Sequence, residues 1–278
     1  PGVWGNTEAL AFADLNKDGQ TGLYLARENK VYGWDANGNT LPNFPIVLPH
    51  NVIEDKFSFA LGGSMSIGDI DNDGDDEIVV AVQPHVIAGS SEAAAKFLIA
   101  YHHDGSIVDG FPTGSLPTDT SVPDGTELAV STYGKAPVIA DIDNDGENEI
   151  VVYYGNSSRI APRLYLAAFE GNGQVMSGWP YHLTPNYRHL PIRSLAVADL
   201  DGNGTKEIVV YHDHCYETAD GWYEDDFLKV FDFTGNISAE ASFIGTILNS
   251  YQDEVILPIL IADIDNDGDK EIFTRFYR

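Results

Sequence analysis

Short runs of consecutive apolar residues are the main hydrophobic pattern of this chain. Residues 150–153 and 208–211 both read Ile-Val-Val-Tyr, a run rich in β-branched and aromatic residues and too short for a helix. The apolar residues are consecutive rather than alternating with polar ones, which is typical of strands buried on both faces. The pattern therefore predicts sheets that have a packing partner on each side. A turn or two of helix is expected only at residues 91–96.

Tight turns separate many of these runs. The dipeptides Asn37-Gly38, Asp104-Gly105 and Asn172-Gly173 are strong hairpin signals between flanking strands. Each belongs to a recurring element in which an aromatic residue is followed, four positions later, by glycine. That element begins at Trp34, Tyr101, Phe169 and Phe231.

An acidic segment that recurs five times organises the whole chain. Its pattern is Asp-x-Asp-x-Asp-Gly-x-x-Glu, preceded and followed by apolar residues, and its leading aspartates lie 55, 72, 58 and 64 residues apart. Such variable spacing indicates one structural unit with connections of different length. The leading residues are Asp14, Asp69, Asp141, Asp199 and Asp263.

Each unit reads as strand, acidic loop, strand, connection, strand, tight turn and strand. We therefore predict an all-β fold, a β-propeller of four-stranded antiparallel blades with the acidic loop between strands 1 and 2 of each blade. The predicted blades cover residues of about 1–56, 57–124, 125–187 and 188–252, with a partial fifth blade at about 253–278. A propeller that ends inside a blade would leave an exposed sheet edge. We therefore expect it to be closed either by further blades or by a neighbouring molecule.

The charge of the chain is unusual. It carries 43 acidic and 15 basic residues, a formal net charge of -28, which argues against nucleic acid as a partner. The single cysteine, Cys215, allows no internal disulfide. No apolar run reaches the 18 residues of a membrane span, so no membrane insertion is expected.

The acidic residues are concentrated in the five loops, which hold 21 of the 43. Oxygen donors at alternate positions of a tight loop can converge on one hard cation such as Ca²⁺, and so many carboxylates would otherwise repel one another. An EF-hand is excluded because it needs a glutamate at position 12, which here is Leu25, Val80, Val152, Val210 or Thr274. The glutamate falls instead at position nine of four loops.

These repeats resemble the FG-GAP and VCBS-type repeats of the integrin α-chain propeller and of bacterial secreted proteins, the bacterial variant being the better match. The resemblance implies three to five Ca²⁺ ions, held by side chains at positions one, three, five and nine and by the backbone at position seven. In the second and third loops these are Asp69, Asp71, Asp73, Asp75 and Glu77, and Asp141, Asp143, Asp145, Glu147 and Glu149. In the fourth and fifth they are Asp199, Asp201, Asn203 and Glu207, and Asp263, Asp265, Asp267, Asp269 and Glu271. The first loop offers Asp14, Asn16 and Asp18 but has Gly22 at position nine.

Other constellations are weaker. His212 and His214 would share a strand face, as transition-metal ligands do, but no third ligand is placed by the sequence, so we expect polar residues of a strand edge. His102 and His103 precede a tight turn and are predicted to be exposed rather than catalytic. Trp222 is the best candidate for a functional surface residue. The sequence contains no recognised catalytic motif, so we expect the chain to have no enzymatic activity of its own.

The expected role is a calcium-braced extracellular module, secreted or at the cell surface, that binds a protein or glycan partner in adhesion or scaffolding. An accessory propeller of a secreted polysaccharide-degrading or proteolytic enzyme is one alternative. A structural subunit of a surface layer or filament is another, and self-association through the unclosed propeller edge would favour it. Fold resemblance alone does not choose among them.

Overall fold

The computed structural model describes residues 9–27, 30–47, 57–86, 97–113, 130–131, 136–156, 163–185, 192–218, 221–248 and 259–274. Within these ranges all regular structure is β, and strands pair antiparallel throughout. The all-β prediction is therefore confirmed. The helical turn predicted at residues 91–96 lies outside the described residues.

The first sheet has four strands in chain order: β1 (Ala9–Ala13), β2 (Gly22–Arg27), β3 (Lys30–Trp34) and β4 (Ile46–Val47). The second has three described strands: β5 (Phe57–Gly68), β6 (Glu77–Val86) and β7 (Phe97–Tyr101). In both sheets the acidic loop joins the first strand to the second, as the sequence predicts.

The third sheet is more irregular at one edge, where β8 (Val130–Ser131) and β9 (Val138–Ala140) both pair with β10 (Glu149–Asn156). It continues through β11 (Arg163–Phe169) to β12 (Tyr181–Pro185). The fourth sheet runs β13 (Ile192–Ala198), β14 (Glu207–Thr218), β15 (Gly221–Phe231) and β16 (Ile237–Leu248), and the fifth pairs β17 (Leu260–Ala262) with β18 (Glu271–Phe273).

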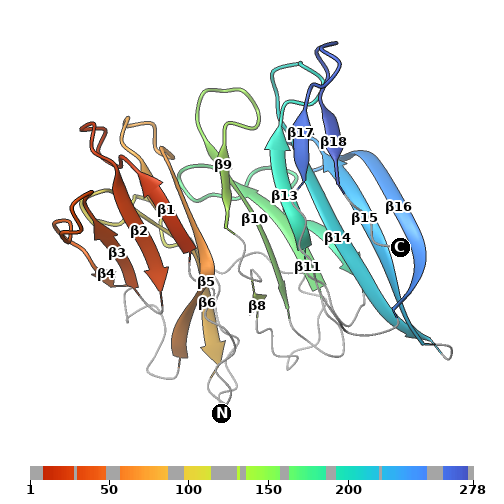
Figure 1. Cartoon of the computed structure of the whole chain (residues 1–278), viewed down its shortest axis with the longest axis horizontal. Coiled ribbons are helices and arrows are strands. Elements are labelled where there is room, and N and C mark those ends of the chain that lie inside the picture. The colour runs from red at the N-terminus through yellow and green to blue at the C-terminus, as the bar shows by residue number, and fades with distance from the viewer. Residues whose placement is uncertain are drawn as a thin grey trace.

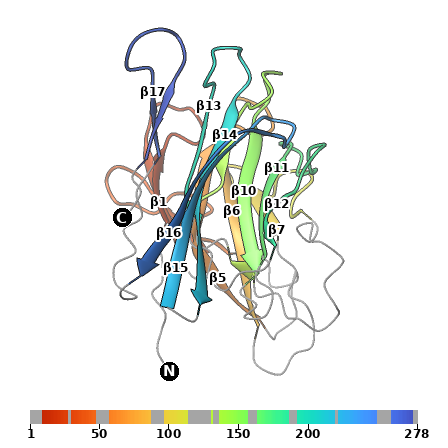
Figure 2. The same cartoon turned by 90° about the vertical axis from the view of Figure 1, so that its right-hand side faces the viewer.

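The sheets lie side by side in chain order (Figure 1), and Figure 2 shows the same row from its end. An apolar cluster fills the space between each sheet and the next. On β6, Ile78 and Val80 pack toward the first sheet, whereas Val79 and Ala81 pack toward the third. This two-sided burial explains why the strands read as unbroken apolar runs.

The hairpin turns form where the sequence predicts them. The N–H groups of Gly38, Gly105 and Gly173 donate to carbonyl oxygens three residues earlier at 3.0, 2.9 and 2.8 Å. All three glycines have a positive φ of 79° to 84°, the conformation that a glycine adopts without steric cost. Each turn brings the end of a third strand back beside the acidic loop of the same sheet.

Candidate metal centres

The acidic loops share one backbone conformation. Each turns through a left-handed residue at position four, which is Lys17, Asn72, Asn144, Asn266 or, in the fourth loop, Gly202. The glycine at position six is left-handed in all five, with φ between 88° and 103°. Two left-handed residues in one short loop curl the chain around a centre, so that side chains at several positions can point inward.

Backbone N–H groups hold the carboxylates in place. The glycine N–H at position six donates to the aspartate at position one over 2.7–3.3 Å, and the residue at position seven donates to the side chain at position five over 2.8–3.0 Å. In four loops the N–H at position two donates to Oε2 of the position-nine glutamate over 2.7–3.0 Å. These bonds fix at least one oxygen of each carboxylate that accepts them, and in Asp14 and Asp141 both oxygens accept a backbone N–H.

Four groups of acidic side chains result, each with its ligand atoms within 4.8 Å of one another. They are Asp71, Asp73, Glu77 and His102; Asp141, Asp143 and Glu149; Asp199, Asp201 and Glu207; and Asp263, Asp265 and Glu271. The predicted ligands of these four loops that lie outside the groups are Asp69, Asp75, Asp145, Glu147, Asn203, Asp267 and Asp269. Each loop with a position-nine glutamate therefore gathers at least three carboxylates, and their role as metal ligands stays a prediction.

Several carboxylate oxygens in these loops are buried without a hydrogen-bond partner within the described residues. They are Oδ1 of Asp69, Asp199 and Asp263 and Oε1 of Glu149. Leaving a buried charged oxygen unsatisfied costs roughly 1–3 kcal/mol or more. A cation at the centre of each loop would satisfy these atoms, and the all-oxygen donor sets of the third, fourth and fifth loops suit a hard ion.

The electrostatics of the third loop have the same cause. Glu149 is 0% exposed, and this burial raises the pKa of its carboxyl to about 7 despite the N–H bond from Ile142. The carboxylates of Asp143, Asp145 and Glu170 raise the pKa further by repulsion. Burial likewise raises the pKa of Glu77. In the second and third loops, burial and neighbouring carboxylates therefore disfavour the charged form of the position-nine glutamate.

The first loop differs, as its sequence suggests. Position nine is Gly22, and a Cβ added there would lie 2.6 Å from the hydroxyl of Tyr24 and 2.9 Å from the adjoining ring carbon. The tyrosine thus fills the space that a glutamate side chain needs. Asn16 donates to Asp18 at 3.1 Å, so part of the loop is satisfied internally. Asp14, Asn16 and Asp18 belong to none of the four groups.

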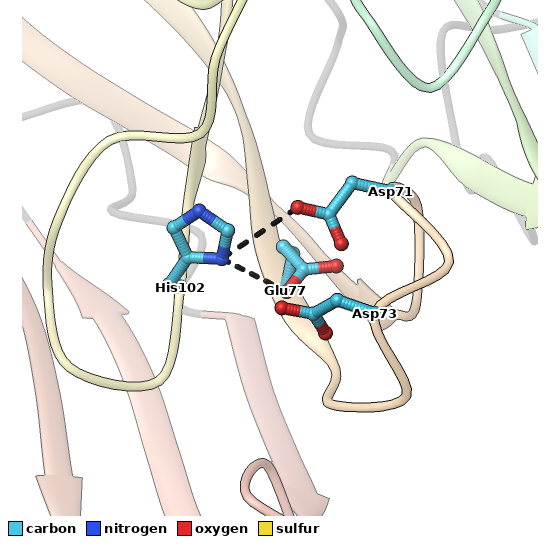
Figure 3. A group of neighbouring side chains, drawn as sticks. All are labelled: Asp71, Asp73, Glu77 and His102. Carbon is cyan, nitrogen blue, oxygen red and sulfur yellow. Dashed lines mark hydrogen bonds and ion pairs between the residues drawn. The ribbon is translucent and has the colours of Figure 1, made fainter.

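Two histidine predictions need correction. His102 is only partly exposed and its Nδ1 faces the second loop (Figure 3), which the sequence analysis missed. The signal was present in the sequence, because His102 occupies the position after the aromatic residue of the hairpin element, where the other units have acids. His212 is 1% exposed and its ring stacks on Phe227 at 5.1 Å. It lies on β14, an inner strand between β13 and β15, and so it is no exposed edge residue.

The side chains of His214, Cys215 and Trp222 lie outside the described residues. The functional interpretations of these three residues therefore stay predictions. No helix in the described part of the chain is long and apolar enough to cross a membrane.

Residues 141–210, from the third loop through the third sheet and the fourth loop, match the FG-GAP-like repeat family. The other loops have the same backbone geometry and the same place between the first two strands of a sheet. This match assigns residues 141–210 to an FG-GAP-like repeat. The resemblance read from the sequence is thus confirmed, and the units can be called blades.

Solved structures and curated proteins give more distant comparisons. A GH43 β-1,3-galactosidase solved with galactodeoxynojirimycin has a TM-score of 0.42 at 10% identity, over 93% of this chain and 82% of that one. A lectin from Agrocybe aegerita that recognises non-reducing terminal N-acetylglucosamine has a TM-score of 0.28 at 12% identity, over 85% of this chain and 80% of the lectin. No curated protein matches the sequence.

Proposed function

We propose that this chain is a calcium-binding propeller that serves outside the cell as a binding or scaffolding module for a protein or glycan partner. One observation carries the proposal. In four loops at least three carboxylates converge, and buried carboxylate oxygens there lack any hydrogen-bond partner among the described residues. A protein gains nothing from such an arrangement unless a cation completes it.

Calcium is the cation that the donor chemistry favours. Ca²⁺ takes six to eight oxygen ligands in a flexible arrangement, and curled loops of carboxylates and backbone carbonyls provide them. Mg²⁺ demands a stricter octahedral geometry and keeps several waters. The third, fourth and fifth loops offer only oxygen donors in their groups. Sites of this kind are commonly filled where calcium reaches millimolar concentration, which supports an extracellular setting.

The position of the loops supports a bracing role rather than a chemical one. Each loop joins the first two strands of its blade and lies against the loop of the next blade. The N–H of Asp76 donates to the carbonyl of Leu15, and the N–H of Lys270 donates to the carbonyl of Leu200, both at 2.7 Å. An ion that fixes one loop therefore stiffens a blade and its junction. The strongly acidic surface, with a net charge of -28, disfavours nucleic acid as the partner.

Calcium titration of the metal-stripped full chain by isothermal calorimetry tests the proposal. We expect three to four calcium ions per chain, at most one for each group, within the three to five that the repeat predicts. Glu149→Gln and Glu207→Gln should each remove or strongly weaken one site. The control Glu240→Gln changes an acid that pairs with Lys229 on β15 at 3.6 Å, and it should leave the count unchanged.

Two results would contradict the proposal. One is heat of binding no greater for calcium than for buffer. The other is a calcium stoichiometry that Glu149→Gln and Glu207→Gln leave as it is, because the ions would then bind elsewhere.

A further inference from the structure

The hairpin turn of the second blade places an imidazole beside the second loop. Ile78 pairs with Tyr101 in the antiparallel register, so the adjacent residues Glu77 and His102 lie opposite each other where β6 begins and β7 ends. Nδ1 of His102 lies 3.3 Å from Oε1 of Glu77 and 3.9 Å from Oδ2 of Asp71 (Figure 3). Nitrogen and oxygen donors therefore share one centre.

The backbone holds the imidazole in this place. The N–H of His102 donates to the carbonyl of Ser106 at 2.9 Å, and the carbonyl of His102 accepts the N–H of Gly105 at 2.9 Å. These two bonds fix the turn on which the ring is mounted. The neighbouring His103 points elsewhere, since its Nδ1 lies 3.1 Å from Oδ2 of Asp75.

One carboxylate beside the ring is fully buried, whereas Asp71 and Asp73 are exposed. Glu77 is 0% exposed, and the bond from the N–H of Ile70 to its Oε2 at 2.9 Å leaves Oε1 to face the imidazole. In the same loop, Oδ1 of Asp69 is buried without a hydrogen-bond partner among the described residues. The loop thus holds more carboxylate charge than the donors around it satisfy, and a bound cation would offset that charge.

This nitrogen donor distinguishes the second blade from the others. The same antiparallel register places Glu170 opposite Glu149, Asp232 opposite Glu207 and Asp35 opposite Gly22. The third, fourth and fifth groups contain carboxylates alone. In the first four blades, as far as the structure describes them, only the second has a histidine opposite position nine of its loop.

The donor set suits a softer ion than calcium, and the distances allow one. Two atoms that each bind one ion at about 2.1 Å can lie no more than about 4.2 Å apart. The separations of 3.3 and 3.9 Å from Nδ1 to the two carboxylate oxygens satisfy that limit. Imidazole nitrogen is a good ligand for Zn²⁺, Ni²⁺, Cu²⁺ and Fe²⁺, whereas calcium sites in proteins use oxygen.

We propose that the second loop is a mixed oxygen and nitrogen site for a borderline divalent transition ion of the Zn²⁺ class, with Nδ1 of His102 as the nitrogen ligand. Asp71, Asp73 and Glu77 supply the oxygen ligands. The inference rests on the proposed function, because it takes the loops to be divalent-cation sites. It adds that the blades differ in the ion that they select, so that one chain holds calcium and a transition metal at neighbouring loops.

The test uses the full chain, stripped of metal and then saturated with calcium. Zn²⁺ is titrated by calorimetry, and Cu²⁺ is added separately to detect nitrogen coordination by electron paramagnetic resonance. We expect one Zn²⁺ to bind in the presence of excess calcium, and the Cu²⁺ spectrum to contain nitrogen coupling. His102→Gln, which keeps an oxygen donor, should lower the Zn²⁺ affinity by at least about tenfold and reduce the nitrogen coupling. His103→Gln, at the next residue of the same turn, should bind Zn²⁺ as the wild-type protein does.

The outcomes separate the two proposals. If Zn²⁺ fails to bind over calcium, or if His102→Gln binds it as tightly as wild type, the transition-metal site is overturned and the calcium function stands. An equal loss in His103→Gln would overturn it as well, since a general effect on the turn would then explain both variants. Failure of every variant and the wild type to bind either calcium or Zn²⁺ would overturn both proposals.

Discussion

At the scale of single residues, position nine decides what each loop can hold. A glutamate there reaches back to the N–H at position two and closes the group of carboxylates, as Glu149 does with Ile142 at 2.7 Å. In the first loop that place is taken by the end of Tyr24, which packs beside Gly22. The Tyr24 side chain at position eleven thus occupies the space of the position-nine glutamate, and we expect this loop to bind no ion.

The first loop should be convertible into a metal site. The second, third and fourth loops have glutamate at position nine and valine at position eleven. The double variant Gly22→Glu with Tyr24→Val, which introduces both residues into the first loop, should therefore add one calcium ion per chain. Gly22→Glu alone should lower the melting temperature without adding an ion, because its Cβ would meet the Tyr24 hydroxyl at 2.6 Å. Calorimetric counting of calcium checks this. A double variant that binds no more calcium than wild type would refute the role of position nine.

The raised pKa of Glu149 predicts an unusual pH dependence for the metal-free protein. Its folded-state pKa of about 7 lies above the ordinary value of 4.5, so the folded chain holds this proton more tightly than the unfolded chain does. The contribution of Glu149 to stability is therefore full below pH 4.5 and is lost as pH rises toward 7. The slope is at most about 1.4 kcal/mol per pH unit.

Urea unfolding at several pH values, with chelator present, measures this effect as the difference between wild type and Glu149→Gln. The variant should lose less stability than wild type between about pH 4.5 and pH 7, since its side chain does not titrate. Saturating calcium should reverse the wild-type trend, because the ion binds the ionised carboxylate. Parallel pH profiles for the two chelated proteins would show that Glu149 is not perturbed as described.

At the scale of the elements, position eight connects each loop to the one before it. The backbone N–H of Lys206 donates to the carbonyl of Ile142 at 2.8 Å, and its ammonium donates to the carbonyl of Asp141. Lys270 makes the same pair of bonds to Leu200 and Asp199, both at 2.7 Å. In the second loop, where position eight is Asp76, the side chain cannot donate to a carbonyl and instead pairs with Lys17. These loop-to-loop contacts join neighbouring blades through the residues that would bind the ions.

Removing one such contact should weaken the junction between the third and fourth blades. Lys206→Met keeps the alkyl stem and the backbone bond but loses the ammonium, and it should destabilise the protein by about 1–2 kcal/mol. Lys30→Met on β3, outside the loop-to-loop contacts, serves as the matched control and should cost less than about 0.5 kcal/mol. Chemical denaturation in saturating calcium compares them. Equal stabilities for the two variants would mean that the side-chain contact adds nothing.

The elements also show which parts of the fold the sequence could predict. The strand runs and hairpin turns were predictable, because apolar runs such as residues 150–153 and dipeptides such as Asn37-Gly38 each permit few conformations. The carboxylates of a loop were predictable as a group because they lie within nine residues. The hairpin repeat marks His102, which stands where the other units have acids, but its contact with Glu77 depends on the pairing of β6 with β7 across 25 residues. The burial of His212 likewise depends on β14 having a strand on each side.

At the scale of the whole molecule, the two ends of the row of blades expose matching apolar faces. Leu10 and Phe12 on β1 are 60% and 71% exposed, whereas Met65 and Ile67, their counterparts in the second blade, pack against the first. At the other end, Ile264 and Phe273 are 62% and 40% exposed, although their counterparts in the earlier blades pack against the blade that follows. Each end thus presents one half of a blade-to-blade interface.

For a sample of these 278 residues alone, these faces predict that one copy stacks head to tail on another. The β1 face of one molecule should cover the β17–β18 face of the next, since blades of the same repeat cover those positions inside the molecule. Sedimentation velocity at rising concentration should show association that Phe12→Ser or Ile264→Ser suppresses. Val47→Ser on β4, which changes another exposed apolar residue, should not. A wild-type chain that stays monomeric throughout would contradict the prediction.

Thermal unfolding of the full chain in millimolar calcium, in the same concentration of magnesium, and in excess chelator tests the central claim most directly. Calcium at about 100 times its dissociation constant adds roughly 2.7 kcal/mol per site, so several sites should raise the melting temperature by more than about ten degrees. Magnesium should raise it much less, because it fits curled carboxylate loops poorly. Equal melting temperatures in calcium and in chelator would contradict the account, since the acidic loops would then hold the blades without an ion.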